Sequence, residues 1–303
     1  MKVFITGSTG FIGRHVLEAT HASGHDILAL TLRGNQPDKY PKNIHWVHGD
    51  LSDLNCWGTR IKTFNPDIVI HLAWQGIPDY SELISRVNLN NSIDLFDYIL
   101  SNTNCSKLLV SGSCWEYGKG QGACKESDLG IIDSYFTWAK HSLNQYLQLK
   151  CLNRNVILNW FRIFYIYGPG QREGSLIPTL IQSICESKIP SIHSPMNKND
   201  FIYVKDVAKT LLAAADTNVP SGIYNLGSGY ATSVYDVCKI VEKQLENLDS
   251  LSEQILKKGQ PDETVNFWAD MKKTEHALNV SFDTGLEEGI KQYISSMQLK
   301  EVL

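Results

Sequence analysis

The sequence contains no apolar run that approaches the roughly 18 residues of a membrane-spanning helix. It also lacks an excess of basic residues, because 28 Lys and Arg face 32 Asp and Glu, which gives a net charge of −4. This balance offers no basic surface for nucleic acid. Repeats and low-complexity segments are missing too, and a composition with 43% hydrophobic and 20% charged residues excludes disordered, collagen-like and coiled-coil classes. We therefore expect neither a membrane nor a nucleic-acid partner.

The cysteines lack any pattern. Seven of them are spread along the chain at irregular spacings, and no Cys-x-x-Cys pair occurs. An odd number at such spacings fits neither a disulfide framework nor a zinc site. We therefore expect reduced thiols, a cytoplasmic protein and no bound metal.

What the sequence does have is an alternation of short β-rich runs with longer amphipathic ones. Continuous apolar runs such as 67–73 suit parallel strands that are covered on both faces. The expected strands are 3–6, 27–31, 45–48, 68–73, 107–111 and 156–166, and the expected helices between them are 11–22, 80–101 and 135–152. This alternation predicts an α/β fold with a doubly wound parallel Rossmann sheet.

The pattern changes after Gly168-Pro169-Gly170, which is typical of a turn. Beyond it the expected helices are 175–187, 204–216, 234–245 and 286–296, with a short strand that starts at residue 222. At about 150 residues per domain, the length fits two domains. We expect a dinucleotide-binding Rossmann domain over 1–168, with a return segment near 200–216, and a smaller C-terminal α/β substrate-binding domain over 169–303.

A glycine-rich loop joins the first expected strand to the first expected helix. Gly7, Gly10 and Gly13 are spaced as a GxxGxxG string. In a dinucleotide-binding loop the first glycine permits a tight turn, the second a close approach of backbone to pyrophosphate, and the third close packing of helix on strand. The free N–H groups at the helix N-terminus then favour the phosphates. The loop predicts a dinucleotide contacted by Gly7, Thr9, Gly10, Phe11, Ile12, Gly13 and Arg14.

Further motifs follow the glycine loop. They are His48-Gly49-Asp50-Leu51, His71-Leu72-Ala73, Ser111-Gly112-Ser113, Tyr117-Gly118, Lys140, Tyr167-Gly168-Pro169-Gly170, 200–208 and Phe267-Trp268-Ala269-Asp270. With this set the sequence resembles the extended short-chain dehydrogenases/reductases over nearly its whole length. It is similar in particular to the branch of NAD(P)-dependent nucleotide-sugar epimerases, dehydratases and reductases. The motifs are specific for the fold and less specific for the reaction.

The resemblance implies further cofactor contacts by Asp50, Leu51, Leu72, Ala73, Ser111 and Lys140. NAD-preferring relatives carry an acid at the end of the second strand, which binds the ribose 2′-hydroxyl. Here Thr31 takes that place and Arg33 follows it, so a 2′-phosphate would meet a cation instead of a repelling charge. We therefore expect NADP as the cofactor, with NAD as the alternative.

Catalysis in the resembling family uses a Ser or Thr hydroxyl, a tyrosine, and a lysine four residues after the tyrosine. Ser113 and Lys140 fit the first and the last, but Phe136 stands where the tyrosine is expected. Tyr135 can take the role only if the helix starts irregularly, because it lies about 140° around an α-helix from Lys140. The alternatives are another donor, such as Tyr117, Tyr165, Cys114 or an ordered water, or a protein that binds cofactor and does little redox chemistry.

Neighbouring positions narrow the reaction that the resemblance implies. Sugar 4,6-dehydratases of the family carry Asp-Glu directly after the hydroxyl, whereas this chain has Cys114-Trp115, so dehydration is not expected. A 4-ketoreductase or a 4-epimerase remains, with substrate contacts by Cys114, Tyr165, Arg172, Ser175 and Leu176. Asn199 and Gln260 replace the arginines that grip a substrate diphosphate in relatives, which leaves open whether the substrate carries one.

The resemblance thus implies an NAD(P)-dependent oxidoreductase or epimerase that acts at C4 of a nucleotide-linked keto-sugar in surface polysaccharide biosynthesis. The alternative, suggested by Phe136, Asn199 and Gln260, is a cofactor-binding protein of the same fold with lost or altered redox chemistry. We also expect a homodimer, because relatives pair through the helices represented here by 88–102 and 138–153.

Overall fold

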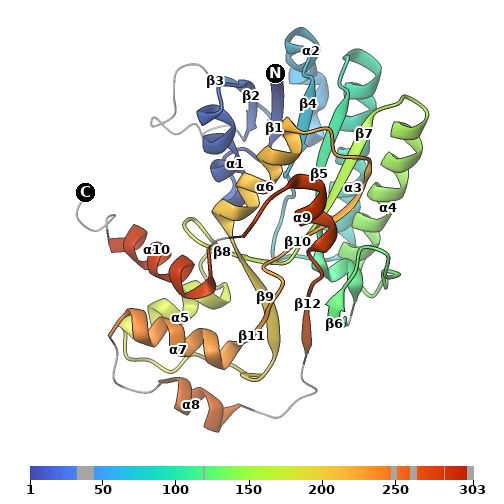
Figure 1. The fold of residues 1–303 in the computed structure, drawn as a ribbon. Helices are drawn as coiled ribbons and strands as arrows, with labels where there is room; N and C mark the ends of the chain where they lie inside the picture. Colours follow the sequence, from blue (N-terminus) through green and yellow to red (C-terminus); the bar gives the residue numbers. More distant parts are fainter. Residues whose placement is uncertain (33–43, 119, 247–250, 260–264, 283, 299–303) are drawn as a thin grey trace.

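The computed structural model of the chain describes residues 1–32, 44–118, 120–246, 251–259, 265–282 and 284–298. Figure 1 shows a large parallel sheet with helices on both of its faces and a smaller lobe built around a second sheet. The predicted α/β class, with a Rossmann sheet and a smaller second unit, is confirmed.

The large sheet has seven strands in the order β10-β7-β5-β4-β1-β2-β3, and all of its pairings are parallel. Its strands are β1 (Lys2–Thr6), β2 (Asp26–Thr31), β3 (Ile44–His48), β4 (Ile68–His71), β5 (Lys107–Ser113), β7 (Ile157–Ile163) and β10 (Gly222–Leu226). The helices that cover it are α1 (Phe11–Ala22), α2 (Leu54–Phe64), α3 (Glu82–Asn102), α4 (Tyr135–Leu152) and α6 (Val204–Asp216). This order is that of a doubly wound dinucleotide-binding sheet, extended by β10.

The apolar strands of this sheet are buried on both faces, as the continuous hydrophobic runs require. Phe4 and Ile5 of β1 are both fully buried, and they belong to different core clusters because successive side chains point to opposite faces. The Ile5 cluster includes apolar residues of α1 and α6. The Phe4 cluster includes apolar residues of α2, α3 and α4. The two hydrophobic layers hold the carboxyl ends of the strands in a fixed arrangement.

The smaller sheet is assembled from distant parts of the chain. Its strands run in the order β11 (Ala231–Ser233), β9 (Lys198–Tyr203), β12 (Asn266–Ala269) and β6 (Gln121–Cys124), and β8 (Tyr165–Tyr167) pairs with β9. The remaining helices are α5 (Leu176–Cys185), α7 (Val234–Gln244), α8 (Leu251–Lys258), α9 (Lys272–Leu278) and α10 (Leu286–Gln298). In Figure 1, α5, α7, α8 and α10 lie on the smaller lobe, whereas α9 lies beside β10.

The chain crosses between the lobes more than once. β6 precedes α4 in the chain but belongs to the small sheet, and α6 returns to the large lobe, where it packs on α1. The helix expected at 80–101 begins at Glu82, after Ser81 as its N-cap, and the run 156–166 is divided between β7 and β8. The elements missing from the prediction include α2, β6, β9, β11, β12 and α9, in which polar and apolar residues are mixed.

Candidate functional site

A ligand crevice is expected where the strand order of a doubly wound sheet reverses, outside the carboxyl ends of the strands. In this sheet the reversal lies at β1, which pairs with β2 on one side and β4 on the other. The glycine loop follows β1, the loop 72–81 follows β4, and the 3-10 helix η2 (Cys114–Tyr117) follows β5. The predicted cofactor and catalytic residues therefore converge on this end of the sheet, which α4 flanks.

The three glycines of the loop are required for space as well as for conformation. Gly7 has a φ of +67°, and a Cβ there would lie 2.9 Å from the backbone nitrogen of Ala73. A Cβ on Gly13 would lie 1.9 Å from the Gly7 carbonyl oxygen, and one on Gly10 would lie 3.1 Å from the same atom. Backbone atoms therefore line the start of α1, as a bound pyrophosphate requires.

The structure describes two of the three residues expected to discriminate between NAD and NADP, namely Thr31 and Arg14. Thr31 is buried at the end of β2, and its hydroxyl lies 3.1 Å from that of Thr9. Arg14 donates from Nε to the Gly10 carbonyl oxygen at 3.3 Å and from Nη2 to the Thr9 carbonyl oxygen at 3.4 Å. Arg14 thus lies against the glycine loop, whereas Arg33 lies outside the described residues.

Hydrogen bonds connect Asp50 to the loop after β4. The Asp50 carboxylate accepts bonds from the backbone N–H and the hydroxyl of Ser52, each at 2.8 Å, and from Gln75 Nε2 at 2.8 Å. Burial raises the pKa of Asp50, but these hydrogen bonds outweigh it and hold the pKa below its usual range. The Gln75 backbone N–H donates to Asn88 Oδ1 on α3 at 2.7 Å. Beside this network Leu51 is buried, and Leu72 and Ala73 are half-buried.

A buried carboxylate positions Ser113 at the end of β5. The backbone N–H of Ser113 donates to Glu116 Oε1 at 2.8 Å. Glu116 is fully buried and also accepts bonds from Trp160 Nε1 at 3.0 Å and from Arg162 Nε at 3.2 Å. A Cβ on Gly112 would lie 2.5 Å from Glu116 Oε1, so this glycine leaves room for the carboxylate.

Glu116 and Arg162 are functional candidates that the sequence prediction omits. The sequence feature that could have identified them is Glu116 itself, which stands between the motifs Ser111-Gly112-Ser113 and Tyr117-Gly118. Charged side chains are seldom fully buried unless they are paired. Glu116 contacts Ser113 and Arg162 is paired with Glu116, so both belong to the support of the site.

Lys140 is buried on α4 and faces the end of β5. Its Nζ donates to the Ser111 carbonyl oxygen at 2.8 Å and lies 4.0 Å from the centroid of the Trp74 ring. Burial lowers the pKa of Lys140 to about 8, and the negative charge of Glu116 opposes this shift. Ser111, whose hydroxyl donates to the His71 carbonyl oxygen at 3.2 Å, thus links β4, β5 and α4.

Phe136, and not Tyr135, shares the buried side of α4 with Lys140. Phe136 is buried, with its ring centroid 5.8 Å from Lys140 Nζ, whereas Tyr135 is 52% exposed. The helix also starts regularly, because the Ser134 hydroxyl accepts a bond from the Thr137 backbone N–H at 3.2 Å. The irregular start that a catalytic Tyr135 needs therefore does not occur, and its position gives no support to that role.

The other predicted donors are engaged or buried. The Tyr117 hydroxyl donates to Asn225 Oδ1 at 2.6 Å. The Tyr165 hydroxyl accepts a bond from Trp115 Nε1 at 3.4 Å, and burial raises the pKa of Tyr165 to about 12. Cys114 is buried among apolar and aromatic side chains, and burial raises the pKa of its thiol. This burial indicates a packing role for Cys114 and gives no support to the predicted substrate contact.

The remaining predicted substrate residues lie between β8 and α5. Arg172 is exposed in that connection, Ser175 is the N-cap residue of α5, and Leu176 is the first residue of the helix. Ser175 and Leu176 are partly exposed. Asn199 is partly exposed on β9, opposite Thr232 of β11, and Gln260 lies outside the described residues.

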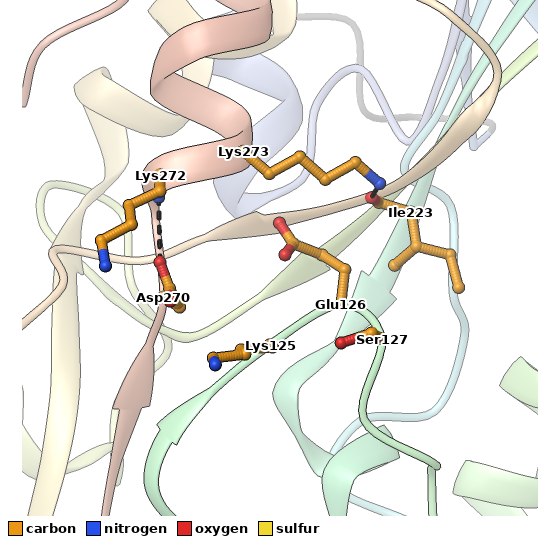
Figure 2. Close-up of a pocket in the computed structure, with 7 residues that line it drawn as sticks. All are labelled: Lys125, Glu126, Ser127, Ile223, Asp270, Lys272 and Lys273. Carbon is orange, nitrogen blue, oxygen red and sulfur yellow. Dashed lines mark hydrogen bonds between the residues drawn. The ribbon is translucent and has the colours of Figure 1, made fainter.

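A separate open pocket of about 460 Å³ lies at the amino end of β10, opposite the end of the sheet that carries the crevice. Figure 2 shows that charged side chains line it and that Lys273 reaches the Ile223 carbonyl oxygen, at 2.6 Å. Glu126 accepts a bond from the Asn225 backbone N–H at 2.9 Å, and the Thr274 hydroxyl donates to the Asn225 carbonyl oxygen at 2.6 Å. These side chains cover the backbone groups of an edge strand, which explains their presence without a ligand.

Comparison with known proteins agrees with this geometry. Residues 3–227 match the model of the NAD dependent epimerase/dehydratase family. That range includes the glycine loop, Ser113 and Lys140. Among the described residues, no helix combines the length and the apolar character that crossing a membrane requires.

Similar proteins cover between 77% and 99% of the chain. It is 25% identical over 318 residues to a putative UDP-glucose 4-epimerase of Methanocaldococcus jannaschii, with 98% of each chain covered. It is 24% identical over 241 residues to the dTDP-6-deoxy-L-talose 4-dehydrogenase (NAD(+)) of Aggregatibacter actinomycetemcomitans, over 77% of this chain and 87% of that protein. The solved structure of UDP-glucuronic acid 4-epimerase from Bacillus cereus, in complex with UDP-glucuronic acid and NAD, has a TM-score of 0.83 at 22% identity, covering 99% of this chain and 100% of that one. At this identity the structural likeness establishes the fold.

Proposed function

Because the chain belongs to the NAD-dependent epimerase/dehydratase family, we propose that it is an enzyme that transfers hydride at C4 of a nucleotide-linked keto-sugar, as a 4-ketoreductase or a 4-epimerase. The observation that carries the proposal is the position of Ser113 and buried Lys140 at the carboxyl end of β5, beside the loops that follow β1 and β4. The names of two similar proteins, a 4-epimerase and a 4-dehydrogenase of nucleotide sugars, support C4 as the reacting carbon.

A nicotinamide dinucleotide fits the residues of the crevice. Gly7, Gly10 and Gly13 form a backbone-lined cradle that any Cβ would fill, and they would hold the pyrophosphate. Asp50 would lie on the adenine side and Lys140 beside the nicotinamide ribose. When bound, the dinucleotide supplies or takes up the hydride.

For the choice of dinucleotide we propose NADP, with NAD as the alternative. Thr31 brings no negative charge to the end of β2, where an acid would repel a 2′-phosphate. Arg14, which lies against the glycine loop, adds a cation. Fluorescence titration with NADPH and NADH tests this choice, and we expect the lower dissociation constant for NADPH. The reverse order would contradict it.

Ser113 and Lys140 have separate tasks in the proposed reaction. The Ser113 hydroxyl donates a hydrogen bond to the sugar oxygen and orients it, while the Glu116 network keeps Ser113 in place. The Lys140 ammonium holds the ribose hydroxyls and stabilises negative charge that develops on the sugar oxygen. Its contact with the Trp74 ring limits where the ammonium can lie.

On the substrate side we propose contacts by Tyr165, Arg172, Ser175 and Leu176. Arg172 is the exposed cation of this group and suits a phosphate. The nucleotide-linked sugars named for similar proteins support that substrate class, and surface polysaccharide synthesis is the proposed use of the product. A panel of UDP-, dTDP- and CDP-linked 4-keto sugars with NADPH tests the activity.

A second candidate function is dinucleotide binding without redox chemistry. Phe136 favours it, because phenylalanine has no proton to donate. The two candidates separate in the same assay. Oxidation of NADPH, or conversion of a nucleotide sugar to its C4 epimer without net oxidation, by wild type and not by Lys140→Ala supports the enzyme. Dinucleotide binding with neither reaction supports the second candidate.

We also propose that the protein is a homodimer that pairs through α3 and α4. Leu83 and Val87 on α3 and Leu149 and Leu152 on α4 are exposed apolar residues. Burial of such residues against a second copy is the usual way to remove them from water. Light scattering at micromolar concentration should give twice the mass of one chain, and the monomer mass would contradict the proposal.

The free cysteine thiols suit a reducing compartment such as the cytoplasm.

A further inference from the structure

Three aromatic rings surround the Phe136 side chain. The ring centroids of Trp74, Tyr80 and Trp115 lie 5.2, 5.2 and 5.7 Å from that of Phe136. Trp74 and Tyr80 come from the loop after β4, and Trp115 comes from η2 after β5. Tyr80 is the member of this cluster that carries a hydroxyl. A phenol therefore lies next to the position at which α4 lacks one.

The Tyr80 hydroxyl is available to a substrate. No described residue forms a hydrogen bond with it, whereas the hydroxyls of Tyr117 and Tyr165 are already bonded to other side chains. Tyr80 is partly exposed, so a ligand and water can both reach it. Its ring is also held in place, with its centroid 4.9 Å from that of Trp115.

We propose that Tyr80 donates the proton that the resemblance assigns to a tyrosine at position 136, so that the phenol comes from the loop after β4 instead of from α4. This role rests on the proposed ketoreductase function. The hydride of the reduced dinucleotide adds to the carbonyl carbon at C4, the π bond of the carbonyl opens, and the carbonyl oxygen takes the proton from the Tyr80 hydroxyl. The ketone becomes a secondary alcohol, the dinucleotide is oxidised, and the Tyr80 phenolate regains a proton from water.

The surroundings of Tyr80 keep its hydroxyl protonated. Burial raises the pKa of Tyr80, and the positive charge of Arg172 opposes only part of that shift. Among the described residues, the Tyr165 hydroxyl is the other titratable group that interacts with it. The phenol is therefore in the protonated form that reduction of a ketone requires.

The test compares variants of the full chain with NADPH and UDP-, dTDP- and CDP-linked 4-keto-6-deoxyhexoses. Tyr80→Phe is expected to lower the single-turnover rate of hydride transfer about 10²–10⁴-fold, the usual contribution of a general acid, with NADPH affinity unchanged. Addition of Phe136→Tyr is expected to restore much of that rate, because it returns a phenol to α4. Tyr98→Phe removes a phenol oxygen from a partly buried ring on α3 and is the matched control, with the wild-type rate.

A second readout needs no dinucleotide and no turnover. In protein labelled with ¹³Cζ-tyrosine, the Tyr80 resonance is identified by its absence from the spectrum of Tyr80→Phe. We expect this resonance to shift when the keto-sugar nucleotide alone is added, because the hydroxyl then donates to the carbonyl oxygen. An unchanged resonance at saturating sugar nucleotide would overturn the role of Tyr80.

The kinetic outcomes separate this role from the proposed function. A Tyr80→Phe variant that transfers hydride at the wild-type rate overturns the role of Tyr80 and leaves the proposed function intact. Activity in Phe136→Tyr but not in wild type overturns the role of Tyr80 and also the proposed function of the natural chain, and it supports dinucleotide binding without redox chemistry. If neither wild type nor Phe136→Tyr oxidises NADPH with any of these sugars, the proposed ketoreductase function fails and the role of Tyr80 fails with it.

Discussion

Removal of the Glu116 carboxylate tests whether a buried ion pair supports the site. Glu116→Ala leaves the Arg162 guanidinium buried without its carboxylate and takes the acceptor from the N–H groups of Ser113 and Trp160. Breaking a buried ion pair in this way costs about 3–5 kcal/mol of unfolding free energy. Arg162 has few alternatives, because its Nη1 already lacks a partner among the described residues.

Two further variants show how much of the lost unfolding free energy comes from the buried Glu116–Arg162 pair and how much from removing a carboxylate as such. Glu82→Ala removes the carboxylate of an exposed pair on α3, in which Glu82 and Arg86 are 58% and 57% exposed. It is expected to cost less than about 1 kcal/mol. Glu116→Leu combined with Arg162→Met removes both buried charges. We expect this double variant to be more stable than Glu116→Ala, because no unpaired charge stays buried.

Urea unfolding followed by circular dichroism measures these differences. Glu116→Ala should also lower the pKa of Lys140 further, because the charge of Glu116 is what opposes the effect of burial there. Dinucleotide affinity should then weaken at a lower pH than in wild type. The reasoning is refuted if Glu116→Ala costs no more unfolding free energy than Glu82→Ala.

Three other predictions concern the cofactor loop and pH. Gly13→Ala is expected to abolish NADPH binding in a fluorescence titration, because its Cβ would lie 1.9 Å from the Gly7 carbonyl oxygen, whereas Gly285→Ala, whose Cβ has no neighbour within 4 Å, should bind normally. Wild-type affinity in Gly13→Ala would contradict the assigned cradle. Calorimetry should give a weaker affinity for NADPH as the pH rises through about 8, where Lys140 loses its proton, and a Lys140→Met variant should bind weakly with no such dependence. Burial lowers the pKa of His71 from 6.5 to about 3. The unfolded chain therefore binds one more proton than the folded chain between these values, and the unfolding free energy should fall by about 2 kcal/mol at pH 5 relative to neutral pH. Urea unfolding of wild type and His71→Gln at both values tests this, and an equal loss in the two proteins would count against His71.

The cofactor loop can be predicted from the sequence because the contacts that shape it are local. Gly10 and Gly13 are both restricted by the Gly7 carbonyl oxygen, only a few residues away. The positions of Phe136 and Lys140 follow from helix periodicity for the same reason, since residues four apart share one face of a helix.

The contacts of Glu116 and the ring cluster around Phe136 cannot be predicted in this way, because they join segments that are distant in the sequence. The partners of Glu116 on β7 are 44 and 46 residues away in the chain. The ring cluster around Phe136 combines two loops and one helix, and only the order of β4 and β5 in the sheet brings them together. Tyr80 stands at the start of the helix expected at 80–101, and its sequence pattern carries no sign of the contact with Phe136.

The side chains that cover the edge of β10 also join the two lobes mechanically. Glu126 follows β6 and Thr274 lies on α9 after β12, yet both are hydrogen-bonded to Asn225 of the large sheet. Asn225 Nδ2 in turn donates to the carbonyl oxygens of Cys124 and Asp270, at 2.8 and 3.2 Å. A hinge that separated the lobes along this line would break all of these bonds together. These bonds therefore restrain a separation of the two sheets beside β10.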